Sequence, residues 1–316
     1  RVGSSAASDV YKRQGVHHVH IRRMAPPITV GDWVIVADGA VVDVLPRRSL
    51  LQRHDPADPT GQLLAANVDV VVVVTGLDRP VRAGRLQRFV AQTWDAGAIP
   101  MVALTKIDLE DDFGRAVDEI VRGVPAIDVV SISSMTGQGI SELRGHLEGR
   151  TAVLVGESGA GKSTLLNALA EESRAEVGTV RSGDHKGRHT TTARQLHILD
   201  GDVCLIDTPG LRAVGLWTDV ETVDQVFDDV QSCSEACRFN DCLHESEPGC
   251  AVRAAVESGE LDADRFEGWK RLRREARAAE IRSDPHASRV AGRQFGRLTR
   301  EALRLKRQDG ASRDDD

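Results

Sequence analysis

The chain reads Gly156-Glu157-Ser158-Gly159-Ala160-Gly161-Lys162-Ser163-Thr164 near its midpoint, and this stretch decides the fold. It follows an apolar, β-prone run, Val153 to Val155, and precedes Leu165 to Ala170, which we expect to be helical. A strand, a glycine-rich loop and a helix in this order are the context of a phosphate-binding P-loop. Backbone N–H groups of such a loop and the helix N-terminus bind phosphate oxygens. The sequence therefore predicts a nucleotide site built from the whole stretch.

Particular side chains around the P-loop have predicted roles. Lys162 is expected to reach the β- and γ-phosphates and to act in catalysis, and the Ser163 hydroxyl is expected to ligate Mg²⁺. Asp207 ends the apolar run Val203 to Ile206, where a Walker-B carboxylate that holds Mg²⁺ would stand. It opens the turn Asp207-Thr-Pro-Gly210, and we expect the Gly210 N–H to contact the γ-phosphate during catalysis.

A polar stretch, Gly187-Arg-His-Thr-Thr-Thr192, separates these two motifs. One threonine here is expected to complete the Mg²⁺ shell when the γ-phosphate is present. We assign Thr191 to this role, with Thr190 and Thr192 as alternatives. Leu211 follows Gly210, and an apolar side chain cannot orient the attacking water. His189 is the nearest titratable candidate for catalysis, the alternative being that it is only a loop residue.

A base-recognition motif, Thr105-Lys106-Ile-Asp108, ends the apolar run Ile99 to Leu104. The Asp108 carboxylate can accept from the N1–H and the exocyclic amine of guanine, donors that adenine lacks there. Lys106 is expected to lay its stem across the ring, and Ser133 and Ser134 to offer backbone N–H groups to guanine O6. Thr105 stands where asparagine is usual.

The order of these motifs is rotated. In an ordinary GTPase the P-loop comes first, then the Asp-Thr-Pro-Gly turn, then the residues that read guanine. Here Asp108 and Ser133 precede Gly156, and Gly210 comes last. This order narrows the candidate proteins far more than the P-loop does.

A cysteine cluster follows the nucleotide motifs. Cys237, Cys242, His244 and Cys250 have the spacing C-x4-C-x-H-x5-C, which suits a closed, structural Zn²⁺ site. Cys233 is a spare that could compete as a ligand. A disulfide, or unrelated free thiols, are the alternatives, and no secretory signal favours the disulfide.

These motifs resemble those of the ribosome small subunit-dependent GTPase A family, a circularly permuted GTPase family. The matching stretches are Thr105 to Asp108, Gly156 to Ser163, Gly187 to Thr192, Asp207 to Gly210, and Cys237-Arg-Phe-Asn-Asp-Cys242-Leu-His244 with Glu247-Pro-Gly-Cys250. The similarity runs from about Pro27 to about Arg277. It implies hydrolysis of GTP to GDP, stimulated by the small ribosomal subunit during its late maturation. It also implies that the protein binds the subunit's rRNA and is released once GTP is spent.

The expected fold is α/β: a circularly permuted P-loop GTPase domain over 63–217, a truncated N-terminal OB-fold over 15–62, and a C-terminal helical zinc-binding domain with a basic tail over 218–316. Residues 1–14 resemble a translated library adapter, and we exclude them as non-native. Strands before Pro26 are expected to be missing from the barrel. Gly31 to Val36 and Ala40 to Val44, joined at Asp38-Gly39, predict a hairpin.

From Asn67 onward, predicted strands alternate with helices, which indicates a parallel sheet covered on both faces. The strands are 68–74, 99–104 and 129–131, and the helices are 85–96, 114–122 and 139–147. A circular permutation changes the order of the elements along the chain, but the same elements still pack beside one another. The strand that ends at Asp207 leads through 219–230 into the zinc domain, and we expect nucleotide state to move that domain.

Charge is distributed unevenly. The net charge is −7 at pH 7, yet Arg265 to Arg307 holds 14 Lys and Arg against 5 Asp and Glu. A helix over 265–282, with Phe266, Trp269, Leu272 and Ala276 at helical spacing, could contact rRNA phosphates. The alternative is an amphipathic helix that only packs on its neighbours. No apolar run approaches membrane-spanning length, and we expect a cytoplasmic monomer without membrane contact.

Three classes of function compete. The first is a ribosome-stimulated GTPase with Mg²⁺ and one structural Zn²⁺. The second is a P-loop ATPase or kinase, which Asp108 disfavours. The third is a zinc-bearing RNA-binding protein with a vestigial nucleotide site, which the intact Lys162, Ser163 and Asp207 disfavour.

Overall fold

The computed structural model describes residues 18–21, 27–55, 58–125, 127–177, 195–207 and 219–283. Its centre is a six-stranded sheet in the order β10-β11-β9-β6-β7-β8. The strands are β6 (Val70–Gly76), β7 (Ile99–Thr105), β8 (Asp128–Ile132), β9 (Thr151–Gly156), β10 (Gln195–Leu199) and β11 (Val203–Asp207). All neighbours are parallel except β10, which pairs antiparallel with β11. The predicted parallel sheet is confirmed, and β10 is an edge strand that the sequence pattern did not reveal.

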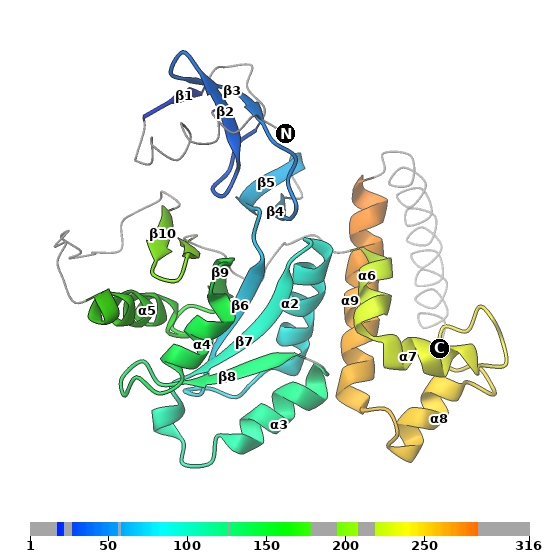
Figure 1. Cartoon of the computed structure of the whole chain (residues 1–316). Helices are drawn as coiled ribbons and strands as arrows, with labels where there is room; N and C mark the ends of the chain where they lie inside the picture. The colour runs from blue at the N-terminus through cyan, green and yellow to red at the C-terminus, as the bar shows by residue number, and fades with distance from the viewer. Residues whose placement is uncertain are drawn as a thin grey trace, which may run out of the picture.

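Rotation of the chain order is visible in the pairing. β6 lies between β7 and β9, so Val72 is paired with Met101 on one side and Leu154 on the other. The strand that opens the central region is therefore beside the strand that leads into the P-loop (Figure 1). Because the strands run parallel, the chain leaves β6, β7, β8, β9 and β11 at the same edge of the sheet.

Helices cover both faces of this sheet. α2 (Ala83–Asp95) and α3 (Gly114–Gly123) share a core with Val71 and Val73, whereas α4 (Ile140–Leu147) and α5 (Lys162–Val177) share a core with Val70, Val72 and Val74. Burial on both faces explains the unbroken valine run of β6. Each fully buried valine contributes about 1.5–3 kcal/mol of transfer free energy. The helices predicted over 85–96, 114–122 and 139–147 are confirmed, with ends shifted by at most two residues.

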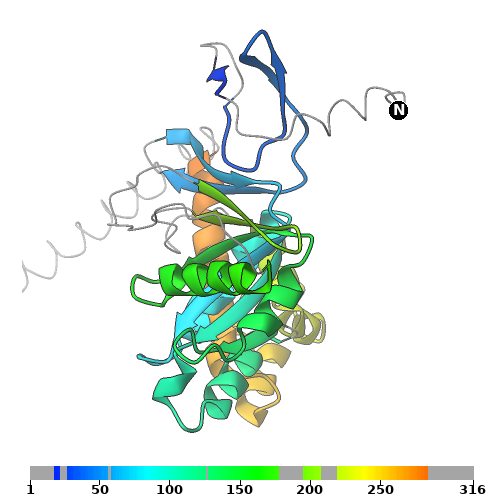
Figure 2. The ribbon, with the colours of Figure 1, turned by 60° about the vertical axis from the view of Figure 1, so that its left-hand side comes forward.

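The N-terminal strands lie beyond one end of the central sheet (Figures 1 and 2). β1 (His20–Ile21), β2 (Val34–Ala37) and β3 (Ala40–Val44) form one sheet, and β4 (Leu50–Asp55) pairs with β5 (Asp58–Ala66) in another. The β2–β3 hairpin is as predicted, with Asp38 at φ 52° and Gly39 at φ 71° in its turn. The expectation that no strand precedes Pro26 is wrong, because β1 pairs in parallel with β3. The strands described do not close into one five-stranded barrel.

The C-terminal part is helical. It comprises α6 (Val220–Val226), α7 (Asp228–Glu235), α8 (Ala251–Ser258) and α9 (Ala263–Ser283). α9 carries the apolar stripe that the sequence predicted, and Phe266, Trp269 and Leu272 are buried with Phe227, which lies between α6 and α7. α9 also runs beside α2 of the central region (Figure 1). Among the helices described, none combines the length and the apolar character that crossing a bilayer requires.

Candidate functional site

The carboxyl edge of the sheet gathers the nucleotide motifs. β9 leads into Gly156 and the P-loop, β7 leads into Lys106 and the short 3₁₀ helix η1 (Ile107–Leu109), and β8 leads into Ser133. Open α/β sheets bind ligands outside the carboxyl ends of their strands. The structure thus brings together segments that lie far apart in the sequence.

Backbone conformation explains the glycines of the loop. Gly156, Gly159 and Gly161 have φ values of 145°, 81° and 96°, a region that side-chain-bearing residues rarely adopt. A Cβ at Gly156 would also overlap the carbonyl oxygen of Val74 on the neighbouring strand. The Lys162 ammonium folds back into the loop, donating to the carbonyls of Gly156 at 2.9 Å and Glu157 at 2.6 Å.

The remaining loop residues are placed as a P-loop requires. Ser158 and Gly159 are exposed at the tip, Ala160 is buried against the sheet, and Ser163 and Thr164 are in the first turn of α5. The N–H groups of that first turn have no partner within the helix and face the loop. The arrangement suits a bound anion.

Thr105 and Lys106 connect the base-recognition motif to the P-loop. Thr105 is buried, and its hydroxyl donates to the Ala160 carbonyl at 2.6 Å. The Lys106 ammonium donates to the Gly159 carbonyl at 2.7 Å. Threonine in place of the usual asparagine therefore still bonds to the loop, through a hydroxyl.

Asp108 and Ser133 contact each other across two loops. The Ser133 hydroxyl donates to Asp108 Oδ1 at 2.5 Å and accepts from the Thr136 N–H at 3.2 Å. The Ser133 N–H, predicted to donate to guanine O6, donates to the Gln138 carbonyl at 3.0 Å in this structure. In this structure Ser133 orients the carboxylate of Asp108, and Ser134 beside it is half-buried.

The structure describes two of the three predicted magnesium ligands. Ser163 is the second residue of α5, which follows β9 and the P-loop, and Asp207 ends β11, the strand paired with β9. Both residues therefore follow or end neighbouring strands at the same edge of the sheet, as a shared Mg²⁺ would require. Thr191, His189, Gly210 and Leu211 lie outside the described residues.

Sequence reasoning missed three charged residues beside the P-loop. Asp78 and Arg79 follow β6, and Arg85 is in α2. Asp78 pairs with Lys106 at 2.9 Å, while Arg79 and Arg85 both pair with Glu157 of the P-loop. The hydrogen bond from Lys106, followed by that from Arg79, holds the pKa of Asp78 below its ordinary value. For Asp78 and Arg79, the position just after a parallel strand was the available signal.

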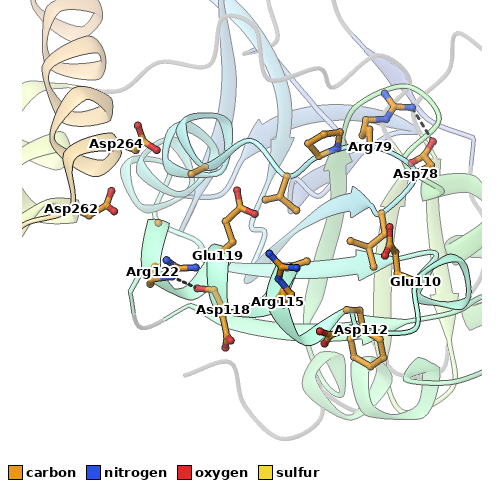
Figure 3. Close-up of a pocket in the computed structure, with 17 residues that line it drawn as sticks. Asp78, Arg79, Glu110, Asp112, Arg115, Asp118, Glu119, Arg122, Asp262 and Asp264 are labelled. Atoms are coloured by element: carbon orange, nitrogen blue, oxygen red, sulfur yellow. Dashed lines mark hydrogen bonds and ion pairs between the residues drawn. The ribbon is translucent and has the colours of Figure 1, made fainter.

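A groove opens beside these residues (Figure 3). It measures about 990 Å³ and lies between the β6–α2 loop, α3 and the turn before α9. Its charged lining comprises Asp78, Arg79, Glu110, Asp112, Arg115, Asp118, Glu119, Arg122, Asp262 and Asp264. The groove lies beside the P-loop, whose residues do not line it.

The cysteine cluster is assembled as the spacing predicted. Ligand atoms of Cys237, Cys242, His244 and Cys250 all lie within 4.8 Å of one another. Cys237 Sγ is 4.0 Å from Cys250 Sγ and 3.6 Å from His244 Nδ1, which is 3.4 Å from Cys250 Sγ. Tetrahedral Zn²⁺ with bonds of about 2.0–2.3 Å sets ligands about 3.3–3.8 Å apart, so the four residues fit a metal ion.

The surroundings of the cluster order it further. Glu247 accepts from the N–H groups of Leu243, Glu245 and Ser246. Backbone hydrogen bonds lower the pKa of Glu247 to about 2. The bond from the N–H of Glu247 itself has the largest effect, and the bond from the Leu243 N–H has the next largest. Cys233 lies outside the group of four and packs against the C-terminal core, and all five cysteines are free thiols, which disfavours the disulfide alternative.

Comparisons with known proteins agree with this geometry. A family model described as RsgA GTPase matches residues 44–217. The small ribosomal subunit biogenesis GTPase RsgA of Streptomyces coelicolor is 43% identical over 291 residues, which cover 89% of this chain and 80% of that protein.

Solved structures give the same fold. YjeQ from Thermotoga maritima matches with a TM-score of 0.59 and 30% identity, covering 79% of this chain and 84% of that one. YloQ, described as a circularly permuted GTPase, matches with a TM-score of 0.57 and 27% identity, covering 82% and 86%.

Proposed function

This chain belongs to the RsgA GTPase family, GTP hydrolases of the P-loop class, and from that premise we propose that it hydrolyses GTP to GDP and phosphate during late maturation of the small ribosomal subunit. The subunit stimulates the turnover, and the protein leaves once GTP is spent. One observation carries the proposal: Thr105 and Lys106 are hydrogen-bonded to the P-loop carbonyls of Ala160 and Gly159. A base-reading turn and a phosphate-binding loop thus form one site.

Each residue of this site has a proposed role. The N–H groups of Gly156 to Thr164 surround the phosphates, and Lys162 leaves its two carbonyl acceptors to reach the β- and γ-phosphates. Asp108, oriented by Ser133, accepts from the N1–H and amine of guanine. Lys106 covers the ring with its stem, and Ser134 offers its N–H to guanine O6.

Hydrolysis needs further groups. Ser163, Asp207 and Thr191 would hold Mg²⁺, which neutralises charge on the β- and γ-phosphates when it is bound. Gly210 would donate its N–H to the γ-phosphate. Because Leu211 cannot orient a water, His189 is the proposed catalytic group of this chain.

The metal of the cysteine cluster is proposed to be a single structural Zn²⁺. Three thiolates and one imidazole are a donor set that zinc prefers, and four protein ligands leave no open position for catalysis. His244 and Cys250 are buried, and the His244 ring lies 5.6 Å from that of Trp269. The site therefore ties the cysteine loop to the core of the helical part.

Binding to rRNA is proposed for the surface beside this cluster. A second groove, of about 630 Å³, is lined by basic residues of α8 and α9: Arg253, Lys270, Arg273, Arg274 and Arg277. Lys270 lies over the ring of Phe266 at 4.7 Å, and Arg273 lies over Trp269 at 4.9 Å. The apolar face of α9 packs inward, and its basic residues line the groove together with Glu245, Glu257 and Glu267. Lys270 and Arg273 pair with Glu267 and Asp224, so binding would exchange these ion pairs for contacts with RNA phosphates.

The remaining parts of the proposal are inferred from membership of the family. The chain works as a cytoplasmic monomer without membrane contact. It is divided into an adapter-like start (1–14), a truncated N-terminal OB-fold (15–62), the permuted GTPase domain (63–217) and the zinc domain (218–316). Nucleotide state changes the position of the zinc domain through the segment between Gly210 and Asp219.

The decisive experiment is GTP hydrolysis by the purified chain, titrated with small ribosomal subunits. We expect turnover to rise with added subunits and to vanish in Lys162→Ala. Displacement of a labelled GTP analogue by GDP and not by ADP separates this function from an ATPase or kinase. Subunit binding without any turnover would instead support a vestigial nucleotide site.

A further inference from the structure

Asp78 is the acidic partner of Lys106 and is two residues beyond the end of β6. We propose that Asp78 is a positioning residue of the base-recognition site, acting through Lys106. The inference deepens the proposed function and rests on it, since the site it refines is the guanine site. Asp78 Oδ2 lies 2.9 Å from the Lys106 ammonium, which also donates to the Gly159 carbonyl at 2.7 Å.

Contacts hold Lys106 at both its backbone and its ammonium. Its backbone is left-handed, with φ 64° and ψ 33°, which is uncommon for a residue with a side chain. Its Cα is fixed at the end of β7, and its ammonium is fixed between Asp78 and the P-loop. The aliphatic stem is thereby stretched across the site where it is proposed to cover guanine.

Gly76 makes room for this pair. A Cβ at Gly76 would lie 2.6 Å from Asp78 Oδ1 and 3.5 Å from Cδ and Cε of Lys106. Any larger residue at this position would press on the carboxylate and on the stem. The last residue of β6 therefore contributes to the arrangement by lacking a side chain.

The contacts continue to the P-loop through Arg79. Arg79 donates to Asp78 Oδ2 at 3.2 Å and to Glu157 Oε2 at 3.5 Å, and Glu157 also pairs with Arg85. Lys106, Asp78, Arg79, Glu157 and Arg85 alternate in charge, and we call these five residues the Asp78 network. It connects the ends of β6 and β7, the P-loop and α2.

Exposure alone would argue for a weak pair, since the side chains of Lys106 and Asp78 are 31% and 28% exposed. Exposed ion pairs often contribute little. Two features distinguish this one: Asp78 Oδ2 is shared by two cations, and Lys106 has a second, backbone acceptor. Removing the carboxylate leaves Lys106 without a counter-ion beside the cationic Arg79, which keeps Glu157, so the ammonium is expected to move off the P-loop.

The consequence for binding is kinetic. When Lys106 moves away, its stem no longer covers the base and its hydrogen bond to Gly159 of the P-loop is lost. Nucleotide should therefore dissociate faster. Selection of guanine should persist, because Asp108 and its Ser133 contact are unchanged. Asp78 should therefore affect how long guanine nucleotides stay bound and leave the choice among purines unaffected.

The test measures dissociation of fluorescent GDP after a chase with unlabelled GDP. We expect Asp78→Ala to release GDP on the order of tenfold faster than the parent chain, as for loss of a charge-assisted contact. The ratio of affinities for GDP and IDP should stay the same. In a Lys106→Ala background, Asp78→Ala should add no further increase, since double-mutant cycles expose dependence of one residue on another.

Two further variants complete the design. Asp112→Ala removes an exposed carboxylate that lines the same groove without contacting Lys106, and it should release GDP like the parent (Figure 3). Asp78→Asn keeps an acceptor oxygen but loses the charge, and it should fall between the parent and Asp78→Ala. It serves as the test if the alanine variant fails to fold.

The outcomes separate cleanly. Parent-like release from Asp78→Ala, or from Asp78→Asn where only that variant folds, overturns the inference while leaving the proposed function intact. An equal acceleration in the Lys106→Ala background also overturns it, because Asp78 would then act on loop stability alone. A parent chain that binds ADP as well as GDP would overturn the proposed function and this inference with it.

Discussion

Arg265 and Asp229 form a two-pronged ion pair in which Nε donates to Oδ2 at 2.5 Å and NH2 donates to Oδ1 at 2.7 Å. The same guanidinium donates to the carbonyls of Gly123 and Val226 at 3.1 and 3.0 Å. Gly123 ends α3 of the central region, whereas Val226 and Asp229 are in α6 and α7. One buried side chain therefore links the C-terminal helices to the nucleotide-binding part.

We expect Arg265→Ala to lower the free energy of unfolding by about 1–3 kcal/mol, because the carbonyls of Gly123 and Val226 lose their donor, whereas Asp229 is 37% exposed and can be solvated by water. Lysine should not rescue it, since an ammonium cannot reproduce the planar fork. Arg253→Ala is the matched control: its pair with Glu257, at 3.7 Å, is exposed, and its loss should cost at most about 1 kcal/mol. Equal losses in chemical denaturation of the two variants would contradict this account.

A pH dependence is expected from Asp95, at the junction of α2 and α6. Burial first, and then repulsion from Asp219, raise the pKa of Asp95 to about 6, while the hydrogen bond from Thr222 opposes the shift. The folded chain therefore binds this proton more tightly than the unfolded chain. Ionisation of Asp95 therefore destabilises the folded chain. This destabilisation is absent below the pKa of the unfolded chain, about 4, and grows as the pH rises to about 6.

Asp95→Asn should accordingly increase the free energy of unfolding at pH 7.5 by about 1 kcal/mol. This figure is smaller than the free energy that corresponds to the whole pKa shift, because the carboxyl is partly exposed and water screens its charge. At pH 4 the two chains should be nearly equal. Denaturation of both chains across this range checks the sign. A difference that is the same at both pH values would show that the asparagine acts through packing.

Metal removal should unfold the cysteine loop and loosen α8. We expect one metal ion per chain, lost on chelation together with a change in the fluorescence of Trp269, whose ring is near His244. Cys242→Ser should lose the ion, whereas Cys233→Ser should retain it, because Cys233 lies outside the ligand group. Retention of metal by Cys242→Ser, or its loss from Cys233→Ser, would refute the assigned ligand set.

Sequence patterns predicted most of the central region because its signals are local. Val70 to Val74 could only be a strand buried on both faces, and the glycines of the P-loop fix its turn. The edge strand β10 was missed because Gln195 to Leu199 alternates weakly, and its partner is set by tertiary structure. Asp78 and the hydroxyl of Ser133 were missed for a similar reason: their partners, Lys106 and Asp108, are brought to them only when parallel strands align their ends.

Asp108→Asn should change the purine that the site prefers. Ser133 donates to Asp108 Oδ1, so an asparagine placed with its carbonyl oxygen there directs its NH₂ group toward the base. That group cannot accept from the N1–H and amine of guanine, but it can donate to the second carbonyl of xanthine. Each lost bond to a charged group costs about 1.5–3 kcal/mol, so GDP affinity should fall roughly a hundredfold or more while affinity for XDP rises. Competition of GDP and XDP for the variant measures both changes. Asp111→Asn, an exposed neighbour on the following turn, should keep the parent preference. An Asp108→Asn chain that still prefers GDP would mean that another residue reads the base.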